Sequence, residues 1–567
     1  MIRRGSGWNA SPGGVLYPRR GRGDSARPLI LAFILLATAA VAAFFVFRIC
    51  SGDDCTDQYC PSGATIATPD GYARLSNVLE WKGSADAAAT ADIQVTVPLN
   101  EQTDDGRNLS FFRYDASTQA WEPFAPAILD QGGRAVTARF NTAPEVVAVM
   151  RRLSAGGHVV AYLPQSASLH PDAVGLVTIV HTRDFSVASD GGIIGTVADP
   201  RVLGLPQGSQ SVHYPTVYVD AGNQQSKAII SGVLSSSQTR TAHVQQIVQR
   251  TVEGNLPGID IWYESLPVTE RTQFALFISE LGQALHAQKK VLTVTLPAPI
   301  RQPDRIDEGA YDWGEIGRAA DVIQMAVYRD QNTYRRDMPT ILDHLTRIVP
   351  PSKIVLTVSP YATEKAPDGS LQSMSVVSAM GIASKLSIHV GTDQRVTTNS
   401  NVDVVATNID RTQGRSGVIW DPQVASVAFT YDLNGGRTVW IENVFSIGFK
   451  LELIPRFGLG GVAIEDASAN QLLGNIWPAL APFVASGQPV LVQPNPDDLV
   501  PAWTVTDGIA EGGQKGVLTW STPANAGTYT ITLALSDGVA RFENEIQVNV
   551  EEAARPAASA TPTAGAR

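Results

Sequence analysis

The sequence predicts an α/β protein built on a (β/α)8 TIM barrel, with a small α+β insertion, a β-sandwich on each side and one N-terminal transmembrane helix. Between residues 156 and 485, short apolar runs alternate with segments of helical spacing, which is typical of a parallel sheet or barrel. Residues 62–152 and 489–550 contain strand-like runs separated by turn residues. Residues 29–47 form an uncharged apolar run long enough to cross a bilayer.

The N-terminal segment is expected to anchor the protein in a membrane. Six arginines precede the apolar run and three aspartates follow it. The positive-inside rule therefore places residues 1–28 in the cytoplasm and the remainder outside the cell. A cleaved signal peptide is the alternative, but the long arginine-rich front and the bulky residues up to Phe47 favour an uncleaved anchor. These features predict a single-pass cell-membrane protein with a large extracellular part.

All three cysteines lie in a short stalk, residues 48–61, that follows this run. In an oxidising exterior Cys55 and Cys60 could pair, which would leave Cys50 for lipidation or an intermolecular bridge; three unpaired thiols are the alternative. No histidine lies nearby, so a zinc site is not expected, and the sequence predicts neither a metal nor another cofactor. The net charge of −11 gives no basic surface, which argues against a nucleic-acid partner.

Within residues 156–485 the pattern predicts eight strands with helices between several of them. The expected strands span 158–162, 176–181, 215–219, 258–264, 291–296, 322–328, 354–359 and 461–464. An insertion over about 365–437 carries strand-like pieces of its own and is expected beside the barrel mouth. Residues 489–550, with turns such as the one around Asp537, look like a bacterial immunoglobulin-like or PKD-like domain, and a disordered tail is expected over 553–567.

The predicted fourth strand carries the chemistry. Alternation places Asp260, Trp262 and Glu264 on one face of the strand, so two carboxylates and an indole line a single wall. The segment resembles the signature of glycoside hydrolase family 18, an Asp-Gly-x-Asp-x-Asp-x-Glu stretch that ends the fourth barrel strand. Gly258, Asp260 and Glu264 fit this signature, whereas Pro257 and Trp262 stand where aspartates belong.

Other stretches extend the resemblance over most of the barrel. Residues 321–328, 353–361 and 439–462 are similar to the runs of that family around strands six, seven and eight. The resemblance implies a barrel close to the spore-cortex and cell-wall members of the family, which act on N-acetylglucosamine polymers. It also implies that Glu264 is the general acid and that Tyr328 bonds the acetamido group of the substrate. Asp260 lies one pleat deeper, and is either a third catalytic group or structural support.

The departures fall on the catalytic positions. In that family, the aspartate two residues before the acid orients the substrate's own acetamido group. Trp262 cannot take this role, because an indole only donates a hydrogen bond and carries no negative charge. Losing one such electrostatic partner costs on the order of 3 kcal/mol of transition-state stabilisation. Ile464 or Glu465 stands in place of the tryptophan that floors the sugar site, and Arg329 replaces the aspartate after the strand-six tyrosine.

Three interpretations of Glu264 remain open. It is a general acid with a replacement carboxylate, a polar contact in a groove that no longer hydrolyses, or a residual carboxylate bonded to a neighbour such as Arg329. The candidate sources of a replacement carboxylate are Glu465, Asp466 and Asp330. The expected substrate-binding residues are Trp262, Tyr361, Trp440, Glu465 and Asp330.

The sequence thus predicts a membrane-anchored surface protein that recognises, and at most weakly hydrolyses, N-acetylhexosamine polymers such as peptidoglycan or chitin. A non-catalytic structural or adhesion protein, with the barrel as its scaffold, is the alternative. An open groove with Glu264 at its base would favour glycan binding, whereas an indole of Trp262 that fills the mouth would favour a scaffold.

Overall fold

The computed structural model describes residues 59–554, with gaps at 70–71, 84–92, 104–105, 107–108, 118, 141, 153–156, 206–208, 390–394, 408–417, 433–435 and 514–515. The chain divides into two compact units, Met1–Pro61 and Ser62–Arg567. In the first unit the described part is strand β1 (Tyr59–Pro61), where Cys60 is disulfide-bonded. The alternative of three free thiols is therefore wrong.

The predicted transmembrane run, residues 29–47, lies outside the described residues, as does nearly all of the tail over 553–567. Among the helices of the described part, none is both long enough and apolar enough to span a bilayer. The N-terminal anchor therefore stays a prediction from the sequence.

The second unit begins with two antiparallel sheets. One sheet has the strand order β3-β9-β5-β6, with β2 also paired to β9, and the other has the order β4-β8-β7. These strands are β2 (Tyr72–Arg74), β3 (Leu79–Trp81), β4 (Ile93–Pro98), β5 (Leu109–Asp115), β6 (Ala120–Pro126), β7 (Ile128–Leu129), β8 (Ala135–Phe140) and β9 (Val146–Arg152). The rings of Phe111 and Phe140 meet edge to face at 5.2 Å between centroids, and join the two sheets through one core.

Eight parallel strands then close into a barrel, which confirms the predicted fold of this region. They are β10 (His158–Leu163), β11 (Ile179–Val187), β13 (Val212–Asp220), β14 (Gly258–Glu264), β15 (Val291–Leu296), β18 (Val322–Met325), β19 (Ile354–Val358) and β27 (Gly461–Ile464). Each pairs with the next, and β10 pairs with both β11 and β27, so that no edge remains open. The short strand β12 (Ile193–Gly195) pairs with β11 in the antiparallel direction.

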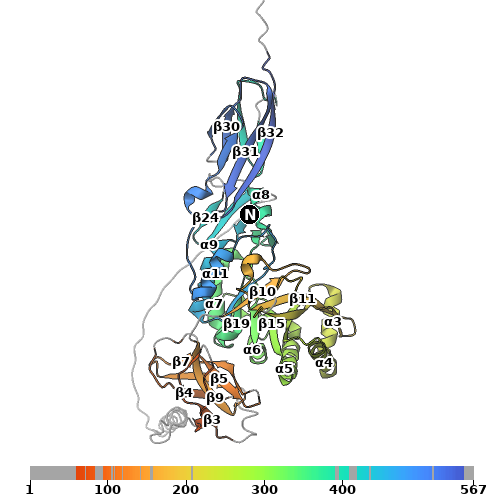
Figure 1. Cartoon of the computed structure of the whole chain (residues 1–567), viewed down its shortest axis with the longest axis vertical. Helices are drawn as coiled ribbons and strands as arrows, with labels where there is room; N and C mark the ends of the chain where they lie inside the picture. Colours follow the sequence, from red (N-terminus) through yellow and green to blue (C-terminus); the bar gives the residue numbers. More distant parts are fainter. Residues whose placement is uncertain are drawn as a thin grey trace, which may run out of the picture. The chain divides into compact units, whose positions relative to one another are not determined.

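Helices cover the outside of the barrel, as Figure 1 shows for α5 and α6 beside β15. They are α3 (Gln224–Leu234), α4 (Ser237–Glu253), α5 (Arg271–Ala287), α6 (Trp313–Ala319), α7 (Gln331–Leu345), α9 (Val444–Leu451), α10 (Leu453–Phe457) and α11 (Trp477–Ser486). Short pieces complete the connections: η1 (Pro171–Ala173), η2 (Val268–Glu270), η3 (Pro351–Lys353), η4 (Pro496–Leu499), and the hairpin β16 (Ile300–Arg301) and β17 (Ile306–Asp307). Phe274, Phe277 and Leu281 of α5 are fully buried in the main core, as their helical spacing predicts.

Side chains that point into the barrel form layers of different polarity. One inner cluster is mainly apolar and consists of Val160, Ile179, Tyr214, Val322, Val355 and Ala463. Closer to the carboxyl ends of the strands, buried polar groups take over, including His181, Thr216, Asp260 and Gln324. Because strand carboxyl ends converge at the mouth of such a barrel, this polar interior leads directly to the place where barrel enzymes bind substrate.

The insertion and the C-terminal segment are not separate lobes. The insertion contains β20 (Ala362–Lys365), β21 (Leu371–Met374), α8 (Val376–Ala383), β22 (Leu386–His389), β23 (Asn401–Ala406), β24 (Ile419–Asp421), β25 (Ser426–Asp432) and β26 (Gly436–Ile441). The C-terminal strands are β28 (Ala502–Val505), β29 (Ile509–Gly512), β30 (Val517–Ser521), β31 (Gly527–Ser536) and β32 (Arg541–Val550). β23 pairs with β30, which makes one sheet in the order β22-β23-β30-β29 from both segments.

A shared core explains this sheet. Val402 and Val404 of the insertion pack with Leu518, Trp520 and Ile531 of the C-terminal segment. A second apolar cluster likewise combines residues of both segments. The self-contained immunoglobulin-like domain expected over residues 489–550 is therefore not confirmed, because part of its core comes from the barrel insertion.

Candidate functional site

Two neighbouring strands, β13 and β14, build the centre of the candidate site. Their register pairs Thr216 with Asp260, Tyr218 with Trp262, and Asp220 with Glu264. Residues in register on adjacent parallel strands point to the same face, and such strands lie about 4.8 Å apart. Three side-by-side pairs therefore rise from the polar interior to the mouth of the barrel.

Asp260 forms the deepest of these pairs and is fully buried. Its carboxylate accepts hydrogen bonds from the hydroxyls of Thr216 at 3.0 Å, Thr293 at 3.0 Å and Thr295 at 3.3 Å. Burial raises the pKa of Asp260, and the opposing effects of His181 and the three hydroxyls are smaller. Asp260 thus lies below Trp262, and its hydroxyl partners link β13, β14 and β15.

Replacing Asp260 by asparagine is expected to change how stability depends on pH. Because the pKa of Asp260 is raised on folding, the folded state binds more protons than the unfolded state above about pH 4. The stability that the protonated carboxyl of Asp260 contributes is complete below the unfolded pKa. It is lost as pH rises through the folded pKa, by at most about 1.4 kcal/mol per pH unit. Urea unfolding between pH 4 and 8 should show this loss in the native protein and not in Asp260→Asn.

An Asp343→Asn variant is the matched control, because the side chain of Asp343 is 60% exposed on α7. It should follow the native pH profile. An Asp260→Asn profile parallel to the native one would contradict the raised pKa.

Trp262 forms the middle layer, between Asp260 and Glu264, and is partly buried. Its ring meets Tyr162 and Tyr218 edge to face, with centroid distances of 5.0 Å and 5.2 Å. The guanidinium of Arg183 lies 4.5 Å from the centroid of the indole. The indole nitrogen is buried and has no hydrogen-bond partner among the described residues. Trp262 thus occupies the place that the resemblance assigns to a substrate-orienting carboxylate.

Glu264 ends β14 at the mouth and is half-buried. Its Oε2 accepts a hydrogen bond from the hydroxyl of Tyr218 at 2.9 Å. Burial, together with the negative charge of Glu264, raises the pKa of Tyr218 to about 12, so this hydroxyl stays a donor at neutral pH. Arg329 is not a partner of Glu264, because it pairs with Glu465 instead. The structure therefore does not support the interpretation of Glu264 as a carboxylate held by Arg329.

The carboxylates expected to replace the missing aspartate are engaged elsewhere. Glu465 accepts from Arg329 at 3.0 Å and from the hydroxyl of Ser359 at 2.6 Å. Asp330 caps the start of α7 and forms an ion pair with Lys365 at 2.8 Å. These bonds tie the loops around the mouth together and leave neither group next to Glu264 by any described contact.

Asp466 is the third of these carboxylates, and it is 4% exposed. It accepts a hydrogen bond of 2.5 Å from the hydroxyl of Tyr361. The hydroxyl of Tyr328 bonds Thr333 at 2.8 Å and Asp337 at 3.0 Å, so it is directed toward α7 in this structure. Tyr361 and Tyr328 therefore stand beside the mouth with their polar ends already paired.

Trp440 does not belong to the site. It is 3% exposed and packs with Val424 and Ala428 in the sheet of the insertion. An indole buried in this way has no free face for a sugar ring, so the structure argues against the predicted binding role.

Sequence reasoning missed two groups at the mouth, Asp220 and Arg183. Asp220 is brought beside Glu264 by the register of β13, and Arg183 reaches Trp262 from β11. The alternation of Thr216, Tyr218 and Asp220 on one strand face was the available signal. It could not show which residue of the next strand each would meet.

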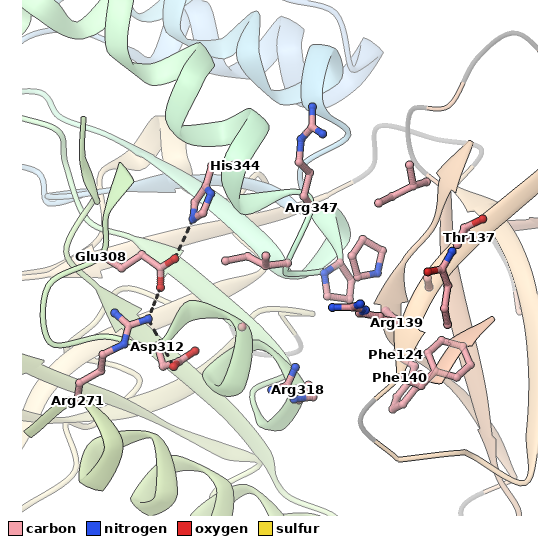
Figure 2. A pocket seen from close by; sticks show the side chains of 18 residues that line it. Phe124, Thr137, Arg139, Phe140, Arg271, Glu308, Asp312, Arg318, His344 and Arg347 are labelled. Carbon is pink, nitrogen blue, oxygen red and sulfur yellow. Dashed lines mark hydrogen bonds and ion pairs between the residues drawn. The ribbon is translucent and has the colours of Figure 1, made fainter. Parts of the chain in front are cut away.

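A second group of titratable side chains lies away from the mouth, on the outside of the barrel (Figure 2). There Glu308 accepts from His344 at 2.8 Å and from Arg271 at 2.8 Å, and Arg271 also pairs with Asp312 at 3.4 Å. The network joins α5, α6 and α7 and serves packing between helices. Among the residues that the structure describes, no group of three or more potential ligands could hold a metal ion.

The fold and the mouth geometry define the class of barrel proteins that carry their functional side chains at the carboxyl ends of the strands. Residues 209–469 match the model of the family described as glycosyl hydrolases family 18. No curated protein matches the sequence.

Among solved structures, a chitinase from Chromobacterium violaceum aligns with 20% identity and a TM-score of 0.45, over 58% of this chain and 99% of that one. The spore cortex-lytic enzyme SleL from Bacillus megaterium aligns with 16% identity and a TM-score of 0.42, over 62% of this chain and 77% of that one.

Proposed function

We propose that this protein recognises an N-acetylhexosamine polymer, peptidoglycan or chitin, at the mouth of its barrel, and that its N-terminal helix holds it at the cell surface. The observation that carries the proposal is the position of Glu264. It lies at the end of β14, with Tyr218 donating to one oxygen and no described cation paired with it. Carboxylates placed in this way accept hydrogen bonds from sugar hydroxyls. The family match over residues 209–469 supports the class of ligand.

Binding rather than family-type hydrolysis follows from Trp262. The substrate-assisted reaction needs a negative charge beside the acetamido group, and the indole provides none. The ring also packs edge to face against Tyr162 and Tyr218, with the guanidinium of Arg183 over it. A sugar at this mouth would therefore meet Arg183, Tyr218 and Glu264 before it met Trp262.

The test uses the full-length protein with N-acetylglucosamine oligomers and peptidoglycan fragments. Calorimetry should detect binding, and Glu264→Gln should weaken it about tenfold, because a charge-assisted hydrogen bond contributes about 1.5–3 kcal/mol. Glu543→Gln, on an exposed strand of the C-terminal segment, is the control and should bind as the native protein does. Absence of binding to every glycan would favour the scaffold or adhesion alternative.

Weak hydrolysis is a second candidate function, and the register of β13 and β14 favours it. Asp220 stands in register with Glu264. Most glycosidases use two catalytic carboxyl groups about 5–9 Å apart. If this pair is catalytic, reducing ends should appear with the native protein and disappear with either Asp220→Asn or Glu264→Gln. Equal cleavage by the native protein and both variants would exclude the pair.

A further inference from the structure

Arg183 is the most unusual side chain at the mouth. It is exposed, yet its guanidinium lies 4.0 Å from the ring centroid of Tyr218 and 4.5 Å from that of Trp262, with Tyr162 at 5.8 Å. Three aromatic rings from β10, β13 and β14 therefore hold one cation in place. Because a guanidinium is attracted to the electron-rich faces of aromatic rings, these contacts favour one position of the Arg183 side chain.

The charge of Arg183 is not neutralised by a described carboxylate. Other cations at the mouth have partners, since Arg329 pairs with Glu465 and Lys365 with Asp330. Arg183 forms no ion pair among the residues that the structure describes, although Glu264 belongs to the same mouth. Because Arg183 is exposed and no described carboxylate accepts from it, N–H groups of its guanidinium can donate to a ligand.

We infer that Arg183 is a subsite for a carboxylate carried by the glycan, and that the protein prefers acidic N-acetylhexosamine units, such as those with a lactyl ether, over neutral ones. This inference rests on the proposed function and names its ligand class. A guanidinium edge offers two parallel N–H donors that match the two oxygens of a carboxylate. Because the rings hold the guanidinium of Arg183 in position before binding, less side-chain freedom is lost when the pair forms.

The carboxylates at the same mouth would bind the hydroxyl groups of the ligand rather than its carboxylate. Glu264 and Asp220 repel an acidic group, but they accept hydrogen bonds from the hydroxyls of a sugar ring. An acidic sugar would therefore bind with its carboxylate toward Arg183 and its hydroxyls toward this pair. A neutral chitin unit would use only the second set of contacts.

Three disaccharides test the subsite on the full-length protein. They are N-acetylglucosaminyl-N-acetylmuramic acid, the same molecule with its carboxylate reduced to an alcohol, and N,N′-diacetylchitobiose. The native protein should bind the acidic disaccharide about tenfold more tightly than the reduced one. Arg183→Leu, which keeps an apolar contact with Trp262, should bring that ratio to about one.

Arg456→Leu is the matched control. Arg456 also lies over a ring, that of Phe457 at 5.3 Å, but on α10, which leads to the opposite end of the barrel. It should keep the native ratio. Equal binding of the acidic and reduced disaccharides by the native protein would overturn the subsite, as would a ratio unchanged in Arg183→Leu. Loss of all three affinities in Arg183→Leu would indicate a structural role for Arg183, and absence of binding by the native protein would overturn the proposed function as well.

Discussion

Replacing Glu442 by leucine is expected to lower the free energy of unfolding by about 3–5 kcal/mol, because the change leaves a buried ammonium without its partner. Glu442 follows β26 and pairs with Lys450 of α9, and their side chains are 1% and 7% exposed. The second oxygen of Glu442 accepts from the hydroxyl of Ser446 at 2.7 Å. The pair therefore fixes the helix that leads from the insertion back into the barrel. Urea unfolding followed by tryptophan fluorescence would measure the loss.

The sign of the pH dependence is a further check on this variant. Burial lowers the pKa of Lys450, and the charge of Glu442 opposes that effect. Without Glu442 the folded pKa falls further below the unfolded value, so the destabilisation should shrink as pH rises toward about 10.4.

A double variant separates the lost pair from the lost charge. Glu442→Leu with Lys450→Met removes both ions, and it should be more stable than Glu442→Leu alone. Glu452→Ala is the surface control, because Glu452 and Arg456 form an exposed pair worth less than 1 kcal/mol. A Glu442→Leu variant no less stable than this control would show that the buried pair contributes nothing.

What the sequence could predict depended on whether a feature is encoded locally or by pairing between distant segments. Strand β14 was predicted over its exact length, Gly258–Glu264, because a buried apolar run with alternating polar residues is a local pattern. Each of the other seven barrel strands overlaps its predicted range, although β11 begins at Ile179, three residues after the predicted start. By contrast, β18 ends at Met325, which places Tyr328 in the following loop and lets its hydroxyl turn toward Asp337 of α7.

Pairings between distant segments were beyond the sequence. Asp220 lies beside Glu264 because of the register between β13 and β14. Arg183 lies over Trp262 because a third strand, β11, carries it there. The pairing of β23 with β30 joins segments more than a hundred residues apart, so each looked like an independent domain. Local pattern thus predicts elements well, whereas the composition of the mouth requires the closed barrel.

The second large effect on stability is expected from Gly461→Ala, because Gly461 lies where β27 pairs with β10 and closes the barrel. Gly461 begins β27 with a φ of +153°, and it pairs with His158 of β10 on one side and Val355 of β19 on the other. A Cβ at this position would lie 2.0 Å from the carbonyl oxygen of His158 and 2.6 Å from its nitrogen. Backbone atoms in a paired strand cannot move aside alone, so β10 and β27 would have to separate.

We expect Gly461→Ala to lose about 3 kcal/mol or more of stability, from the strained φ and the clash together. Gly381→Ala is the matched control, because Gly381 is exposed within α8 and no atom lies within 4 Å of its added Cβ. That change should stabilise the protein by about 0.4–1 kcal/mol through a less flexible unfolded chain. Urea midpoints of the two variants should therefore move in opposite directions. A Gly461→Ala protein with a native midpoint would show that the close approach of β10 and β27 at Gly461 tolerates a side chain. The steric argument for how the barrel closes at these strands would then be wrong.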